Sequence, residues 1–126
     1  MSELLLNTTV ATSVAGMPPA LDMSVIDGLR ALADGDNTMI TEIMTAFLTD
    51  GEDRLRKMYL AIAGGDEAAA RRAAHSLKGM SGSIGAVHLS DLSQHLEKAA
   101  AGTITPERID ALAHEFGRVS AALKTA

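Results

Sequence analysis

Proline is almost absent from this chain, and its absence restricts the folds that the chain can adopt. The prolines lie at positions 18, 19 and 106, so residues 20–105 contain none. Alanine, the strongest helix former, is frequent in this stretch, whereas a proline ring breaks the interior of a helix. The sequence therefore predicts helices rather than strands after position 20.

Apolar residues recur at three- and four-residue steps along most of the chain, which is the pattern of amphipathic helices. Glycine and capping residues divide this pattern into helices at about 24–33, 37–63, 66–84, 87–101 and 106–124. The last four helices cannot bury their apolar stripes alone. We expect an all-α fold, an antiparallel four-helix bundle with the short first helix as an extra N-terminal element that covers one end.

The length fits one domain, but the first residues differ from the rest. Residues 1–20 carry Thr, Ser and Val without a helical period and end in Pro18-Pro19. We expect a flexible N-terminal arm over 1–20 and a bundle domain over 21–126. The arm lacks a basic leader, and the chain lacks a run of about 18 apolar residues, so we expect a cytoplasmic protein without a membrane span.

Composition excludes several classes of function. The 11 Lys and Arg against 16 Asp and Glu give a net charge of −5, which argues against nucleic-acid and anionic membrane partners. The chain has no cysteine, so disulfides, thiol catalysis and Cys-ligated zinc are excluded. Its aromatic residues are one Tyr and two Phe, too few for a base-stacking platform.

His75 stands out because the helical period places it outside the predicted core. At about 100° per residue, the inner side of the third helix is formed by small and apolar residues: Ala70, Ala73, Ala74, Leu77, Ser81 and Ile84. His75 points about 200° away from Leu77. The residues that follow on its own face are Lys78, Gly79 and Gly82.

The two glycines beside His75 have no explanation in helix stability, since each costs roughly 1 kcal/mol relative to alanine. A close approach by another macromolecule would explain them, because glycine leaves space beside the imidazole. An exposed imidazole is partly neutral at pH 7, and an ammonium group suits phosphoryl oxygens. These features favour a histidine that accepts a phosphoryl group. The alternative is an ordinary solvated histidine whose neighbouring glycines serve helix packing.

The run Ala74-His75-Ser76-Leu77-Lys78-Gly79 resembles the signature of histidine-containing phosphotransfer (HPt) domains. The same pattern continues at Ser81, Gly85, Ala86, Leu89 and Leu92. The resemblance covers about residues 22–124.

This resemblance implies a role for four residues. It makes His75 the phosphoacceptor, whose Nε2 attacks the aspartyl phosphate of a receiver domain and later returns the group to another receiver. It makes Lys78 the residue that balances charge on the phosphohistidine, and Gly79 the small residue that admits the partner. Glu97 falls where many members place Gln or Glu on the next helix, a position that can orient the ring through its other nitrogen, although a carboxylate there would also repel the phosphoryl group.

Phosphoryl transfer needs charge neutralisation, usually by a divalent metal. The chain has neither an acidic cluster for Mg²⁺ nor a Gly-x-x-x-x-Gly-Lys-Ser/Thr loop for nucleotide phosphates. We therefore expect no cofactor on this chain, with Mg²⁺ on the partner only, and a phosphotransfer intermediate without kinase or ATPase activity. The expected partners are receiver domains of response regulators or hybrid histidine kinases. We expect this protein itself to be a monomer.

We expect the partner to contact the surface around His75. Its polar part would include Lys78, Arg71 and Arg72, with a shallow dip at Gly79 and Gly82. Its apolar rim would come from neighbouring helices, with three candidates: Met39, Ile43 and Leu48.

Two other functions stay open. The first is a non-phosphorylated adaptor that binds a receiver or kinase domain through the same helical face. The second is a metal-dependent enzyme, because His88 and His95 share a face of the fourth helix with Asp91 between them.

Overall fold

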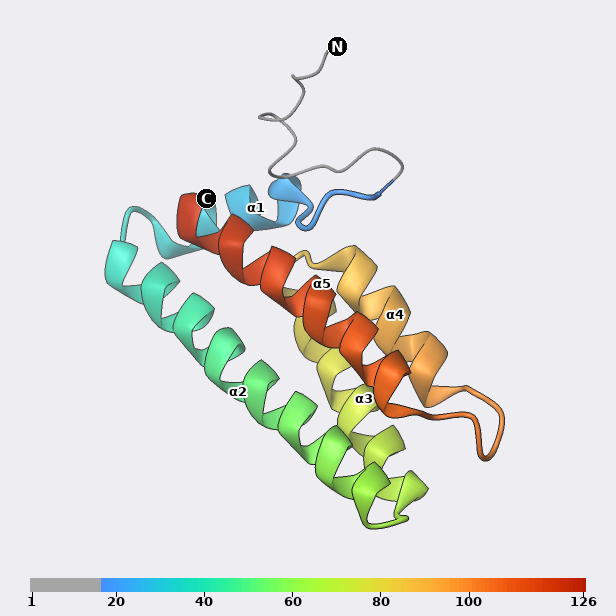
Figure 1. The fold of residues 1–126 in the computed structure, drawn as a ribbon. Coiled ribbons are helices and arrows are strands. Elements are labelled where there is room, and N and C mark those ends of the chain that lie inside the picture. Colours follow the sequence, from blue (N-terminus) through green and yellow to red (C-terminus); the bar gives the residue numbers. More distant parts are fainter. Residues whose placement is uncertain (1–16) are drawn as a thin grey trace.

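Five helices make up residues 17–126, the part of the chain that the structure, a computed structural model, describes (Figure 1). In chain order they are α1 (Met23–Ala33), α2 (Asn37–Ala63), α3 (Glu67–Ser83), α4 (Val87–Glu97) and α5 (Pro106–Thr125). These described residues contain no strand. The predicted all-α fold is confirmed.

Helices α2 to α5 form a closed bundle. Helix α2 packs against α3, α3 against α4 and α4 against α5, and α5 closes the bundle against α2. Consecutive helices run in opposite directions, and α1 lies across the end of the bundle where α5 ends (Figure 1). This is the predicted antiparallel arrangement, with the short helix covering one end.

Side-chain caps begin the helices where the sequence predicts them. Four oxygens accept backbone N–H groups of the first turn: Asp22 from Ser24, Asp36 from Met39, Asp66 from Ala69 and Thr105 from Arg108. Each cap satisfies a donor that would otherwise lack a partner. The capping residues therefore fix the first residues of α1, α2, α3 and α5.

The turn between α3 and α4 requires glycine at position 85. Gly85 has φ +84°, and a Cβ there would lie 2.9 Å from both the Asp22 carbonyl oxygen and Val25 Cβ. The Asp22 amide donates to the Gly85 carbonyl at 2.7 Å. This close backbone contact fastens the start of α1 to the α3–α4 turn.

The core follows the predicted apolar stripes. The inner side of α3 is buried as expected, and α2 and α5 meet at Phe47 and Phe116, whose ring centroids are 5.6 Å apart. Gly51 lets these rings approach, because a Cβ on it would lie 2.3 Å from a Phe116 ring carbon.

Helix α4 ends earlier than the pattern predicts, at Glu97 rather than near residue 101. The guanidinium of Arg71 donates to the Glu97 carbonyl oxygen at 2.7 Å and so takes the place of the next helical N–H group. The chain then turns through Gly102 (φ +80°) and buries Ile104 in the core. Burial of Ile104 and the arginine cap therefore override the alanine-rich sequence after Glu97.

The predicted arm lies largely outside the described residues, which begin at Met17. At its end, Arg118 donates to the Pro18 carbonyl oxygen at 2.8 Å, and Ala20 and Leu21 are buried in the core. None of the helices within 17–126 is long and apolar enough to cross a membrane.

Candidate functional site

His75 stands at the middle of α3, eight residues from either end of the helix. On the opposite side of α3, Ala70, Ala73 and Ala74 are buried, and their small side chains let α2 and α4 pack closely on both flanks. The His75 side chain is 65% exposed. The fold thus presents an accessible imidazole on a helix that is held from both sides.

Glu97 contacts the imidazole ring of His75. Its Oε2 lies 2.8 Å from Nδ1 of His75, although the two residues are 22 positions apart in the chain. An ionised carboxylate can only accept a hydrogen bond, so a neutral ring in this contact carries its proton on Nδ1. Nε2 then keeps its lone pair.

Lys78 completes a three-residue cluster on this face. Its Nζ lies 3.7 Å from Oε1 of Glu97, the carboxylate oxygen that does not contact His75. That oxygen is buried and has no hydrogen-bond partner among residues 17–126. The structure therefore brings together three of the predicted site residues, with one cation and one carboxylate beside the ring.

The two glycines next to the cluster differ in their surroundings. A Cβ at Gly79 would meet nothing within 4 Å, so this position is open. A Cβ at Gly82 would lie 3.7 Å from the hydroxyl of Ser90 on α4, an ordinary contact distance. Helix packing therefore does not require glycine at 79, whereas Gly82 lies against a neighbouring helix.

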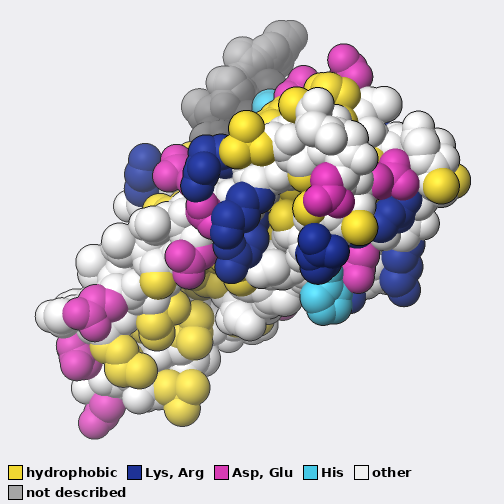
Figure 2. Space-filling model, turned by 90° about the horizontal axis from the view of Figure 1, so that it is seen from below, with side chains coloured by type: hydrophobic (Ala, Val, Ile, Leu, Met, Phe, Trp, Pro, Cys, Tyr) yellow, Lys and Arg dark blue, Asp and Glu magenta, His cyan; other side chains and the backbone are white. Residues whose placement is uncertain are grey.

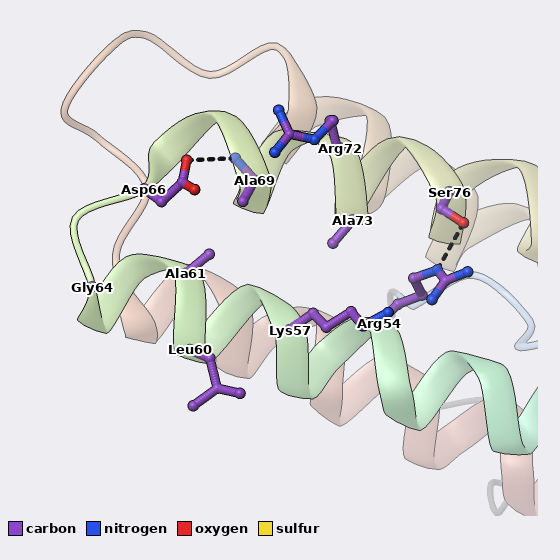
Figure 3. A pocket seen from close by; sticks show the side chains of 10 residues that line it. All are labelled: Arg54, Lys57, Leu60, Ala61, Gly64, Asp66, Ala69, Arg72, Ala73 and Ser76. Atoms are coloured by element: carbon purple, nitrogen blue, oxygen red, sulfur yellow. Dashed lines mark hydrogen bonds between the residues drawn. The ribbon is translucent and has the colours of Figure 1, made fainter.

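A groove between α2 and α3 extends from Ser76, the residue after His75, to the Gly64 turn (Figure 3). It has a volume of about 640 Å³. Arg54 and Lys57 extend from α2, and Arg72 extends from α3 (Figure 3). The first two cations are paired with Asp53, at 2.9 and 3.0 Å, and the hydrogen bond from Lys57 is the largest cause that lowers the pKa of Asp53. Arg72 has no ion pair among the described residues.

Arg54 is a residue that sequence analysis missed. Its Nε donates to the Ser76 hydroxyl at 2.9 Å, directly beside His75 in the chain. Spacing could have found this contact, because Arg54 and Ser76 each lie 11 positions from Gly65 in the α2–α3 turn. In an antiparallel helix pair, residues at equal distances from a tight turn lie side by side.

The guanidinium of Arg71 is not available to a partner as predicted, because it forms contacts within α3 and with the end of α4. Besides the Glu97 carbonyl, it contacts Glu67 Oε1 at 3.0 Å, and Glu67 Oε2 accepts the Gly102 amide at 2.9 Å. The hydrogen bonds from Arg71 and Gly102 lower the pKa of the Glu67 carboxyl. This network ties the loop after α4 to the first turn of α3.

Two of the candidates for the apolar rim have contacts within the bundle. Leu48 lines a hollow with Leu123 and Lys124 of α5, and Ile43 is partly buried against the core.

The histidines outside α3 have different surroundings. His88 and Asp91 line a hollow with Met23 and Val87, while His95 and His114 are exposed. Within residues 17–126, no group of three or more His, Asp or Glu side chains is placed to hold a metal ion.

Charge is unevenly distributed over the surface. On the face in Figure 2, the broad part of the molecule carries Lys and Arg side chains interspersed with acidic and hydrophobic ones, whereas the narrow end shows acidic and hydrophobic side chains without Lys or Arg. A partner that meets this face therefore encounters basic side chains over its broad part and none at its narrow end.

Comparison with known proteins agrees with this geometry. The family described as "Hpt domain" matches residues 42–122. The crystal structure of histidine-containing phosphotransfer protein B (HptB) from Pseudomonas aeruginosa PAO1 is similar, with a TM-score of 0.76 and 31% sequence identity over 86% of this chain and 95% of that chain. No curated protein sequence matches significantly. The family match spans more than half of the chain and includes His75, Lys78 and Glu97, so this chain belongs to the Hpt domain family.

Proposed function

We propose that this protein carries a phosphoryl group on His75 between receiver domains of a two-component phosphorelay. The observation that carries the proposal is the pairing of Nδ1 with Glu97 on a ring that is 65% exposed. A ring held through Nδ1 presents Nε2 to a docking partner. The family membership supports histidine phosphotransfer as the class of function.

The proposed transfer needs no cofactor on this chain, because the bonds that form and break are accounted for by His75 and the partner's aspartyl phosphate. The Nε2 lone pair attacks phosphorus of the partner's aspartyl phosphate, an N–P bond forms, and the P–O bond to the aspartate breaks to leave a carboxylate. The imidazole becomes cationic and keeps its proton on Nδ1, where Glu97 Oε2 stabilises it. The reverse step delivers the group to a second aspartate. The receiver supplies Mg²⁺ and the acidic residues that hold it.

Lys78 neutralises the phosphoryl group in this proposal. Its Nζ lies 3.7 Å from the Glu97 carboxylate that contacts the ring, and an ammonium group suits phosphoryl oxygens. The open position at Gly79 leaves room for the partner's loops, one turn beyond His75. We infer that Gly82 contributes less, because Ser90 covers one side of it.

The basic groove between α2 and α3 extends the docking surface. Its lining includes Arg54 and Lys57, which are paired with Asp53, and Arg72, beside a single acidic residue, Asp66. A receiver active site is acidic because it must hold Mg²⁺. The groove therefore attracts the partner toward the same face of α3, while a small, polar contact still permits release.

Transfer from phosphorylated receiver domains tests the proposal. Wild-type protein should gain phosphate that survives alkali and is lost in mild acid, and His75→Gln should gain none. His114→Gln is the matched control, because His114 is an exposed histidine on α5 and should leave transfer unchanged. Circular dichroism should show that both variants stay helical, since both side chains lie outside the core.

The same experiment separates the adaptor function. Labelling that persists in His75→Gln would place the phosphate elsewhere. A folded wild-type protein that binds a receiver but takes no phosphate from any phosphorylated receiver would contradict the relay and favour an adaptor.

A further inference from the structure

Helix α4 ends at Glu97, and this end point decides where the Glu97 carboxylate lies. The residue makes two contacts with α3: its carbonyl oxygen accepts from Arg71 at 2.7 Å, and its carboxylate contacts His75 at 2.8 Å. Arg71 and His75 are four positions apart, so they occupy the same face of α3 on adjacent turns. The two contacts therefore hold one residue from two successive turns of one helix.

The backbone contact restricts the freedom of the carboxylate. Residues at the end of a helix fray readily because their carbonyl groups lack N–H partners. Arg71 supplies a charged donor at the negative end of the α4 dipole, which stabilises that end. With the Glu97 backbone held, only the side-chain torsions of Glu97 remain to bring its carboxylate to the ring.

Arg71 is itself held in place. Its second terminal nitrogen contacts Glu67 Oε1 at 3.0 Å, and the other Glu67 oxygen accepts the Gly102 amide at 2.9 Å. The Arg71 side chain is 26% exposed and the Glu67 side chain 31%, so solvent competes only in part. The guanidinium thus joins the first turn of α3, the end of α4 and the following loop.

We propose that Arg71 is a positioning residue for the phosphoacceptor: by capping α4 it holds the Glu97 carboxylate against Nδ1 of His75 and keeps Nε2 free of a proton. The inference rests on the proposed function, because it assigns a purpose to the free Nε2. It differs from a docking role for Arg71, since both terminal nitrogens are engaged within the chain.

The imidazole tautomer gives a direct test that needs no partner. In protein labelled with ¹⁵N at histidine, long-range ¹H–¹⁵N correlation at a pH of about 8.5 distinguishes the Nδ1–H and Nε2–H forms of a neutral ring. Wild type should show His75 protonated mainly on Nδ1. Arg71→Ala should shift the ratio of the two forms toward Nε2–H by about fivefold, the effect of losing part of a charge-assisted hydrogen bond.

Matched variants separate positioning from a general structural role. Arg72→Ala removes a neighbouring arginine that does not contact Glu97 and should leave the His75 tautomer unchanged. Glu97→Ala should shift the tautomer at least as far as Arg71→Ala, and the double variant should match Glu97→Ala alone, because Arg71 acts through Glu97. Arg71→Lys should restore part of the wild-type ratio, since an ammonium can still reach the carbonyl.

The outcomes are decisive in both directions. A shifted tautomer in Arg71→Ala that is absent in Arg72→Ala and not additive with Glu97→Ala supports the proposal. An unchanged tautomer in folded Arg71→Ala, or additive effects in the double variant, would overturn it. Failure of the relay itself would look different, because wild type would then take no phosphate whatever the tautomer of His75.

Discussion

Replacing Gly79 with alanine should raise the stability of this protein. A Cβ at position 79 meets nothing within 4 Å, and the backbone there does not have positive φ, so alanine introduces neither a clash nor strain. Alanine is favoured over glycine in a helix interior by roughly 1 kcal/mol. Because no burial is gained, we expect the free energy of unfolding to rise by about 0.5–1 kcal/mol.

A larger side chain at the same position should affect function instead. Gly79→Gln also keeps the helix, but its side chain occupies the space one turn from His75 where the partner is proposed to dock. Overfilling a packed contact costs roughly 1–3 kcal/mol, which corresponds to transfer that is slower by a factor of about 5 to 160. At this one residue, Gly79→Ala should therefore raise stability, whereas Gly79→Gln should slow transfer.

Gly117 on α5 provides the matched control. It is exposed, and a Cβ there also meets nothing within 4 Å. Gly117→Ala should stabilise the fold by a similar amount, and Gly117→Gln should leave transfer at the wild-type rate. Urea unfolding followed by circular dichroism measures stability, and timed transfer from a phosphorylated receiver measures function.

Two results would refute this reasoning. If Gly79→Ala lowered stability while Gly117→Ala raised it, the space beside Gly79 would not be open. If Gly79→Gln accepted phosphate as fast as wild type, the partner would approach His75 from another side, and access would not explain the glycine.

Three further predictions concern charge. Lys78→Ala should slow phosphate acceptance or shorten the phosphohistidine lifetime by about five- to tenfold, because one charge-assisted contact is lost; unchanged kinetics in both respects would remove its neutralising role. Arg72→Glu should slow transfer most at low salt, with the deficit shrinking as ionic strength rises; a deficit independent of salt would argue against electrostatic docking in the groove. Burial and a hydrogen bond to Asp110 raise the pKa of Tyr59 from 10.0 to about 12. The folded state therefore holds the phenol proton more tightly than the unfolded chain, so stability should fall as pH rises between about 10 and 12. Tyr59→Phe should lose less stability over that window in urea unfolding, and an equal loss would show that Tyr59 does not contribute.

Helix positions and the core were predictable because local rules decide them. The capping residues Asp22, Asp36, Asp66 and Thr105 each accept a first-turn amide, as their identity and position predict. The apolar stripes become the core because burial dominates the packing of amphipathic helices.

Buried charged residues beside those stripes were less predictable. Glu115 is 1% exposed beside Phe116, and its carboxylate is paired with Arg118 at 2.7 Å. Periodicity marks position 115 only as adjacent to the apolar stripe. Its burial depends on a partner three residues later, and Arg118 also reaches the Pro18 carbonyl. Such a pair is decided by tertiary packing rather than by the local pattern.

The contacts around His75 show which part of a site the sequence can specify. Two long-range contacts to the middle of α3, from Arg54 to Ser76 and from Glu97 to His75, each join residues 22 positions apart. The two turns that flank α3 are centred near Gly65 and Gly85, so both spacings follow from antiparallel pairing about a tight turn. Spacing alone therefore brings an acid at 97 next to His75. It does not show that α4 must stop there, and a helix continued to residue 101 would leave the Glu97 carbonyl bonded within α4 rather than to Arg71. The orientation of the phosphoacceptor is consequently a tertiary property, which arises where a cap on one helix meets the functional face of another.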